Sequence, residues 1–254
     1  MILRPDAAVA IDAATPPAAM TATTPVPRAV LFDAYGTLFD VYSVARSAEA
    51  LFPGQGERLA ALWRDKQIDY TRLVSMSSGA AGEHYRPFWD LTRAGLRYAA
   101  RRLDLALDAA AEDRLMDEYR QLAAHPENRA VLLALKARGI RAGILSNGDP
   151  DMLAAAVASA GFDGLLDPVL SVQSLRKYKT DPACYALGPQ ALGLPASEIV
   201  FVSSNGWDAI GATWFGYTTL WVNRAGAPAE ELGTAPTRTG TRLVDVLDFF
   251  PSTT

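Results

Sequence analysis

The feature that most constrains the fold of this chain is a series of short apolar runs that recur along it. Each run is rich in β-branched and aromatic residues and leads into polar residues. Runs of this length and composition are typical of strands that are buried on both faces. We therefore predict five buried strands, at residues 29–34, 140–147, 167–172, 198–205 and 217–223.

The segments between these runs have the ends that helices require. One of them stops at Gly139, which suits a helix C-cap. Two others open with Asp149-Pro150 and Asp181-Pro182, and each pair places an N-cap acid before a proline in the first turn. Strands that alternate with helices predict an α/β fold with a Rossmann-like, doubly wound parallel sheet.

A long helical insertion interrupts this alternation. Residues 56–76 and 109–125 are amphipathic, and almost no strand pattern is found from 42 to 125. We predict an all-helical cap domain at 42–125, inserted into a core domain formed by 28–41 and 126–254. Because the insertion follows the first strand, it is expected to overhang the carboxyl ends of the strands.

The first 27 residues differ in composition from the rest of the chain. They are rich in Ala, Thr and Pro, carry acids at Asp6 and Asp12, and lack the continuous apolar stretch of a signal peptide. Such a segment has little to bury. We predict a disordered tail at 1–27, with Met20 as an alternative start.

Composition and charge exclude several classes of function. A formal net charge of −4, with no long run of like charges, gives no footprint for nucleic acid or an anionic membrane. No apolar run approaches the roughly 18 residues that cross a bilayer. The single cysteine, Cys184, excludes an internal disulfide and favours the reducing cytoplasm.

Polar side chains gather where the predicted strands end. One such group alone would be ordinary turn chemistry, but in an open parallel sheet the carboxyl ends of the strands form the ligand-binding edge. Four groups at one edge therefore predict a functional site. They are Asp33 and Thr37 after the first strand, Ser146, Asn147 and Gly148 after the second, Lys177, Tyr178, Lys179 and Asp181 after the third, and Ser203, Ser204, Asn205 and Asp208 after the fourth.

Asp33 is the candidate nucleophile. It directly follows an apolar run, so its carboxylate is expected to be partly dehydrated and to need a nearby cation, for which Lys179 is the candidate. A carboxylate held in this way can form an ester intermediate. Residues 146–148 precede a helix start, where backbone N–H groups favour a substrate carboxylate or phosphate.

The helix predicted at 56–76 has two different faces. Arg64 and Ile68, one turn apart, lie roughly opposite the apolar stripe. The pair suits a helix that looks into a pocket, and the alternative is a solvated arginine beside an isolated isoleucine. The stripe consists of Leu59, Leu62, Trp63, Tyr70, Leu73 and Val74.

Four segments together resemble, in order and spacing, the four motifs of the haloacid dehalogenase superfamily. They are residues 33–40, residues 144–148, Lys179 with Asp181, and residues 203–208. Within the superfamily, the stretches FDAYGTLFDVYSV, ALWRDKQIDYT, ILSNG and FVSSNGWDAIGA look most like the L-2-haloacid dehalogenases. The similarity covers most of the chain after the tail.

The chain departs from the magnesium-dependent phosphatases of that superfamily at two positions. Those enzymes carry a second aspartate two residues after the nucleophile, where this chain has Tyr35, and another acid in the fourth motif, where Asp208 stands alone. Mg²⁺ prefers carboxylate ligands, and a halide leaves without a proton. The resemblance therefore implies carbon–halogen cleavage with no metal and no cofactor.

The resemblance also implies a mechanism. Asp33 would displace halide from a 2-haloalkanoate with inversion, and water would then hydrolyse the Asp33 ester to a 2-hydroxy acid. Thr37 would donate a hydrogen bond to the nucleophile. Lys179 would keep Asp33 ionised, while Tyr185 and Asp208 would fix the lysine.

The remaining implied roles concern water and substrate. Asp208, or a network with Asn205 and Ser203, would position or deprotonate the hydrolytic water. Arg64 would receive the halide or orient the substrate. Ser146 and Asn147 would bind the substrate carboxylate, and the pocket walls would be Tyr35, Ile68, Phe88 and Trp207, for all of which core packing is the alternative.

Three functions compete on these residues: a haloacid dehalogenase, a divergent magnesium-dependent phosphatase of the same fold, and a catalytically silent binding protein. The expected partner is a small 2-haloalkanoate, and a homodimer is implied by the resemblance alone. His84 and His125 match no role in the family and are expected at the surface. An ester hydrolysis that depends on a histidine base is therefore not expected.

Overall fold

The computed structural model describes residues 26–79 and 81–251, and its core is a six-stranded parallel sheet with the order β3-β2-β1-β4-β5-β6. The predicted α/β class is confirmed. All but the last two residues of the predicted disordered tail, Met20 included, lie outside the described residues. The strands are β1 (Ala29–Phe32), β2 (Arg141–Ser146), β3 (Val169–Ser171), β4 (Ile199–Ser203), β5 (Thr218–Val222) and β6 (Arg238–Gly240).

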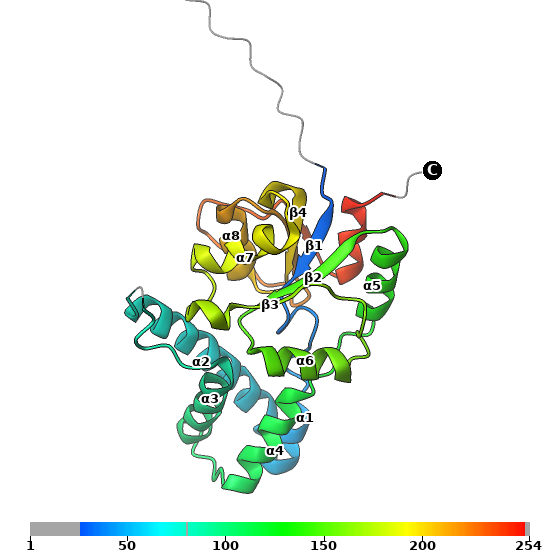
Figure 1. The fold of residues 1–254 in the computed structure, drawn as a ribbon. Helices are drawn as coiled ribbons and strands as arrows, with labels where there is room; N and C mark the ends of the chain where they lie inside the picture. The colour runs from blue at the N-terminus through cyan, green and yellow to red at the C-terminus, as the bar shows by residue number, and fades with distance from the viewer. Residues whose placement is uncertain (1–25, 80, 252–254) are drawn as a thin grey trace, which may run out of the picture.

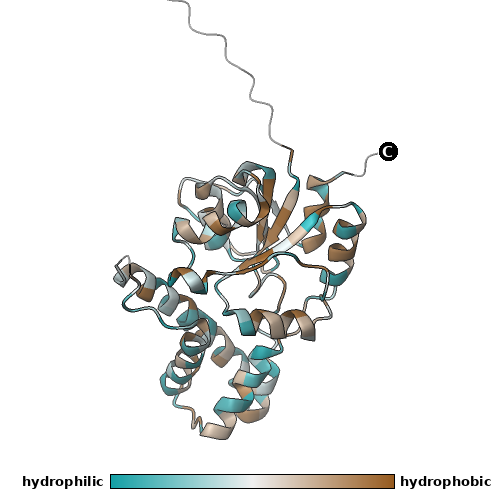
Figure 2. Cartoon of the chain, in the orientation of Figure 1, coloured by the Kyte–Doolittle hydropathy of each residue, from teal (hydrophilic) through white to brown (hydrophobic). Residues whose placement is uncertain are grey.

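The central strands are apolar because helices cover both faces of the sheet. Every residue of β1 and of β4 is buried, as expected for parallel strands. In Figure 1, α7 and α8 lie on one side of the strands and α5 on the other, and Figure 2 shows the strands as the most hydrophobic part of the core. The covering helices are α5 (Asn128–Ala137), α6 (Pro150–Ser159), α7 (Pro182–Leu192) and α8 (Gly206–Phe215).

Strand β6 was not predicted from the sequence. It has only three residues, Arg238–Gly240, none of which is buried. It pairs with β5 at the edge of the sheet, and an edge strand needs no apolar run because only one of its sides is paired. The short 3₁₀ segments η1 (Val172–Leu175), η2 (Ala196–Glu198) and η3 (Leu243–Phe249) complete the core.

Two of the three predicted helix ends have the expected contacts. Helix α5 is followed by Gly139 with φ +69°, a left-handed conformation that suits glycine. The carboxylate of Asp181 accepts a hydrogen bond from the Ala183 N–H at 2.9 Å and so caps α7. Asp149 stands at the N-cap of α6 but makes no side-chain bond to that helix. Its carboxylate binds another element instead.

Between β1 and α5, the described residues form four helices: α1 (Ala45–Leu51), α2 (Gly56–Ser77), α3 (Phe88–Arg102) and α4 (Ala109–Arg120). Figure 1 shows them grouped together, apart from the sheet. The two segments that connect these helices to the core are joined by a hydrogen bond, in which the Asp40 N–H donates to the Ala123 carbonyl at 2.8 Å. No helix in the described ranges is long and apolar enough to span a membrane.

Candidate active site

Asp33 lies at the carboxyl end of β1 and is 6% exposed. Three side chains bind its carboxylate. The Thr37 hydroxyl and the Asn205 amide donate to Oδ2 at 3.0 and 2.9 Å, and the Lys179 ammonium donates to Oδ1 at 3.2 Å. These donors replace the water that burial removes from the carboxylate.

Lys179 is fully buried and lies between two carboxylates. Its Nζ is 3.1 Å from Oδ2 of Asp208, and the Tyr185 hydroxyl donates to the other oxygen of Asp208 at 2.7 Å. Burial disfavours the ammonium, but the attraction of Asp208 and Asp33 outweighs it and raises the pKa of Lys179 above its ordinary value. The lysine is therefore a fixed positive charge beside Asp33.

The turn after β4 supports Asn205 and Thr37. Ser203 is fully buried, and its hydroxyl accepts from the Asn205 N–H at 3.1 Å. The Thr37 hydroxyl accepts from the Ser204 N–H at 2.8 Å. This bond directs the Thr37 hydrogen toward Asp33, because the hydroxyl has only one hydrogen to donate.

Arg64 reaches the same site from α2. Its guanidinium donates to the Tyr35 carbonyl at 2.9 Å and to the Asn205 side-chain oxygen at 3.2 Å, and it is 7% exposed. The alternative of a solvated Arg64 is therefore wrong. The predicted apolar stripe also needs correction, because Leu73 is 57% exposed.

Gln67 belongs to the buried face of α2 and was not predicted as a site residue. Its side-chain oxygen accepts from Arg64 at 2.7 Å and from the Tyr119 hydroxyl at 3.0 Å, while its amide donates to the Thr92 hydroxyl. These bonds hold the Arg64 side chain in place through Gln67. A signal was present in the spacing, since residues 64, 67 and 71 recur at helical intervals.

The space above Asp33 is a cavity of about 10 Å³, which is enough for about one water molecule. All six predicted substrate-pocket residues besides Arg64 line it. Thr71 lines it as well and was not predicted. The lining consists of Asp33, Tyr35, Arg64, Ile68, Thr71, Phe88, Ser146, Asn147, Asn205 and Trp207.

Five of the predicted catalytic side chains do not belong to that lining, namely Thr37, Lys179, Tyr185, Ser203 and Asp208. Thr37, Lys179 and Asp208 are buried, with Thr37 and Lys179 touching Asp33 directly. Tyr185 is held one step further away by its bond to Asp208. Both oxygens of Asp208 are occupied by these bonds, so Asp208 is better placed to hold Lys179 than to contact water.

The loop after β2, residues 146–148, provides hydrogen-bond donors on the wall of the cavity that Ser146 and Asn147 form. The Ser146 hydroxyl accepts from the Gly148 N–H at 3.0 Å, so its own hydrogen is available to a ligand. The side-chain oxygen of Asn147 accepts from the Lys179 N–H at 2.9 Å, so the amide NH₂ of Asn147 faces away from that bond. A side chain at Gly148 would collide with the Tyr35 ring, with a Cβ only 2.6 Å from Cε2.

The histidines are only partly at the surface. His84 is exposed, as expected, but His125 is half-buried and burial lowers its pKa. Neither histidine lines the cavity above Asp33.

The acidic residues are not arranged as a metal-binding cluster. No group of three or more His, Cys, Asp or Glu suited to a metal ion is found in residues 26–79 and 81–251. The two carboxylates of the site, Asp33 and Asp208, are bridged by the Lys179 ammonium. The donor set therefore fits an organic substrate with a small anionic group better than a divalent cation.

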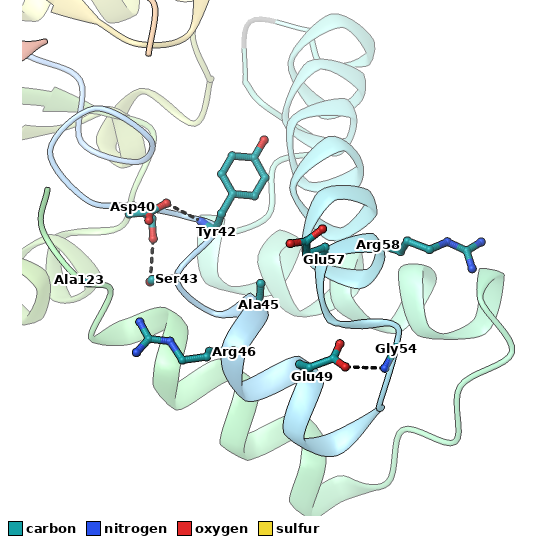
Figure 3. Close-up of a pocket in the computed structure, with 10 residues that line it drawn as sticks. All are labelled: Asp40, Tyr42, Ser43, Ala45, Arg46, Glu49, Gly54, Glu57, Arg58 and Ala123. Carbon is teal, nitrogen blue, oxygen red and sulfur yellow. Dashed lines mark hydrogen bonds between the residues drawn. The ribbon is translucent and has the colours of Figure 1, made fainter. Parts of the chain in front are cut away.

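A larger cavity, about 710 Å³, opens elsewhere, between α1 and the two segments that connect the helical insertion to the core (Figure 3). Two of its three acids, Asp40 and Glu49, are already used in local hydrogen bonds. Glu49 accepts from the backbone N–H groups of Gly54 and Gly56, and Asp40 accepts from the Tyr42 N–H. None of the polar strand ends lines it, so size does not make it the site of chemistry.

Comparison with known proteins agrees with this site. A family model described as a haloacid dehalogenase-like hydrolase matches residues 27–216. The chain therefore belongs to the haloacid dehalogenase-like hydrolases. Among curated proteins, the (S)-2-haloacid dehalogenase of Pseudomonas sp. (strain YL) is 44% identical over 223 residues, 88% of this chain and 94% of that protein.

Solved structures place the chain beside the same group within these hydrolases. A crystal structure of an L-2-haloacid dehalogenase is 60% identical, with a TM-score of 0.85, and covers 88% of this chain and 98% of its own. An L-2-haloacid dehalogenase from Xanthobacter autotrophicus, with chloropropionic acid covalently bound, is 35% identical with a TM-score of 0.80. That match covers 89% of this chain and all of the other.

Proposed function

We propose that this protein is an (S)-2-haloacid dehalogenase that hydrolyses short 2-haloalkanoates through an ester of Asp33. The observation that carries the proposal is the geometry of Asp33. Its carboxylate borders the cavity and is bound by the Lys179 ammonium at 3.2 Å. The related dehalogenase with covalently bound chloropropionic acid supports an ester intermediate.

In the first step, an oxygen of Asp33 attacks the halogen-bearing carbon from the side opposite the halogen. The new C–O bond forms as the C–X bond breaks, so the halide leaves with the bonding electrons and the centre is inverted. The Lys179 ammonium, bound to Asp33 at 3.2 Å, holds the nucleophile in the direction of attack.

Arg64 and the loop after β2 orient the substrate. We assign the halide to Arg64, whose guanidinium keeps a positive charge at any relevant pH. The substrate carboxylate is assigned to Ser146 and Asn147, near the first turn of α6. Tyr35, Ile68, Phe88, Thr71 and Trp207 enclose the carbon chain.

In the second step, water adds to the carbonyl carbon of the Asp33 ester. The tetrahedral intermediate expels the 2-hydroxy acid, whose oxygen takes one proton from the water, and the other proton is released as Asp33 ionises again. We assign the water to the Asn205 and Ser203 side of the site, with Lys179 stabilising the oxyanion. Asp208 then acts by holding Lys179.

The second candidate, a magnesium-dependent phosphatase, is disfavoured by two side chains. Tyr35 has its ring packed against Tyr119 at 5.7 Å and offers no carboxyl group to protonate an alkoxide. Lys179 binds both Asp33 and Asp208, so the carboxylate oxygens that it holds are not free for a magnesium ion. A halide needs neither a proton nor a metal to leave.

The test is halide release from both hands of 2-chloropropionate, with EDTA present. We expect turnover of the (S) form alone, and a loss of at least about 10³-fold in Asp33→Asn because the amide is a poor nucleophile. The matched control is Asp65→Asn, an exposed acid next to Arg64. Activity only with Mg²⁺ and a phosphate ester would favour the phosphatase.

Single-turnover hydrolysis in H₂¹⁸O tests the ester itself. If the ester forms, water oxygen enters the Asp33 carboxylate first and the first product carries unlabelled oxygen from the protein. Peptide mass spectrometry of residues around Asp33 measures this incorporation. Label that appears directly in the hydroxy acid would exclude the ester and favour direct attack by water.

We also propose that α1–α4 act as a cap domain spanning 42–125 and that the enzyme works in the cytoplasm.

We further propose that the enzyme is a homodimer. Support for the dimer is the surface of α2, where Leu73 is 57% and Met76 is 86% exposed. Sedimentation should give a dimer that Leu73→Asp with Met76→Asp dissociates. Leu133→Asp, on α5 and 41% exposed, is the control. A wild-type monomer would exclude the dimer.

A further inference from the structure

Asp149 binds a helix far from it in sequence. It follows the Ser146–Gly148 loop, and its two carboxylate oxygens accept hydrogen bonds from the backbone N–H groups of Phe88 and Trp89, at 3.0 and 2.7 Å. These are the first two residues of α3. Asp149 is 7% exposed, so both bonds are shielded from water.

The Asp149 carboxylate caps α3 and not α6, the helix that it precedes. The N-cap of α3 is Pro87, which has no side-chain acceptor, and α3 has no side-chain cap of its own. Helix α6 begins directly after Asp149 but receives no bond from its side chain. The carboxylate therefore joins the core to the helical insertion, where first-turn N–H groups favour an anion.

The bond fixes two opposite walls of the substrate cavity relative to each other. Phe88 is 3% exposed and packs 5.4 Å from the Tyr35 ring, while Ser146 and Asn147 form the other wall. The cavity between them is small, about 10 Å³, so the separation of the walls decides what fits. Asp149 joins the two walls through its bonds to α3 and so limits that separation.

The bond also directs a negative charge away from the proposed carboxylate site. Asp149 is two residues from Asn147, and a free carboxylate there would repel an anionic substrate. Two N–H donors instead accept it on the side of α3. One carboxylate thus supports the position of Phe88 and the binding of the anion.

We propose that Asp149 is a positioning residue that sets the separation of Phe88 from the Ser146–Gly148 loop and so determines which 2-substituents the enzyme accepts. This inference rests on the proposed dehalogenase function. It concerns specificity and not the displacement step, because Asp149 touches neither Asp33 nor Lys179 within the hydrogen bonds of the described residues.

Asp149→Ser is the decisive variant, because serine is a good N-cap for α6 but is too short to reach α3. We expect KM for 2-chloropropionate to rise about tenfold, as for the loss of charge-assisted hydrogen bonds. The kcat/KM ratio of 2-chlorobutyrate to chloroacetate should rise at least about threefold. Asp149→Asn, which keeps one accepting oxygen, should lie between this variant and wild type.

Asp151→Ser is the matched control, since Asp151 is exposed in the first turn of α6. It should keep the wild-type KM and chain-length ratio. Amide hydrogen exchange gives a reading that needs no turnover. We expect exchange at Phe88 and Trp89 to be about tenfold faster in Asp149→Ser than in Asp151→Ser, because only the former loses its acceptor.

The proposal is overturned if Asp149→Ser, folded by circular dichroism, keeps the wild-type KM and chain-length ratio. It is also overturned if every substrate loses kcat equally while the ratio stays constant, because that pattern indicates a structural role alone. A wild type that releases no halide from any haloacid overturns the proposed function instead. The exchange rates at Phe88 and Trp89 would still test the contact.

Discussion

Lys179 is the residue on which the charges of the site depend. It lies between Asp33 and Asp208, and its Nζ is also 4.8 Å from the centre of the Phe201 ring. A buried ammonium is stable only where carboxylates and a polarisable surface replace water. The cluster therefore acts as a unit, and removal of one member is expected to affect the others.

Tyr185→Phe tests this dependence without removing a charge. The hydroxyl donates to Asp208 at 2.7 Å, so its loss leaves a buried carboxylate oxygen unsatisfied. We expect a loss of about 1–3 kcal/mol in the free energy of unfolding and about a tenfold slower ester formation, because Lys179 is less firmly held. Urea unfolding and single-turnover halide release measure the two effects. Tyr42→Phe, at a tyrosine that is 55% exposed, should leave ester formation unchanged; an equal slowing would contradict the role of Tyr185.

At the scale of elements, α2 is the helix that joins the insertion to the chemistry. Its buried residues are Gly56, Leu59, Ala60, Trp63, Arg64, Gln67 and Thr71, so the face turned inward is partly polar. Helix α2 packs mainly on α3, where Trp63 donates to the Thr92 carbonyl at 2.7 Å. The position of Arg64 therefore depends on α3 as well as on α2.

Gln67→Ala should uncouple Arg64 from this support. The substitution removes an acceptor for Arg64 and Tyr119 and a donor for Thr92. We expect kcat/KM for 2-chloropropionate to fall about 10- to 100-fold, because the guanidinium can then turn away from the halide. Lys66→Ala is the control, since its bond to Asp69 lies at the surface. Equal kinetics in both variants, with both proteins folded, would show that Arg64 needs no support from Gln67.

At the scale of the whole molecule, the buried lysine links stability to pH. The pKa of Lys179 is raised in the folded protein, because nearby Asp208 and Asp33 outweigh burial. A group whose pKa rises on folding stabilises the folded state fully below its unfolded pKa, about 10.4 for lysine. That contribution is lost as the pH rises through the folded value.

We therefore expect no alkaline loss of stability or activity from Lys179 between pH 7 and about pH 10, and a decline above it. Urea unfolding measures the free energy at several pH values, and halide release gives kcat/KM over the same range. A fall in kcat/KM centred near pH 8 to 9 would contradict a raised pKa of Lys179, if it persists with a substrate whose side chain does not ionise. Asp65→Asn serves as the surface control in both measurements.

Strands β1–β5 and the order of the polar residues at their ends could be predicted from the amino-acid pattern alone, whereas β6 could not. Apolar runs such as β1 and β4 had to be buried on both faces, and parallel strands bring Asp33 and Asn205 to the same edge. That neighbourhood follows from local patterns, because each strand carries its own hydrophobic signal. The all-helical character of the insertion, and α2 and α4 within it, were predictable for the same reason, but α1 and α3 were not located from the sequence.

The partners of individual side chains could not be predicted, because they come from elements that are distant in sequence. Asp149 has the sequence of an ordinary N-cap for α6, yet its carboxylate binds α3, 60 residues away. Gln67 is a polar residue on a helix, yet it is fully buried, while Leu73 on the same helix is largely exposed. The physical reason is that periodicity defines the faces of a helix, but burial depends on which neighbour covers each face, and that neighbour is distant in sequence.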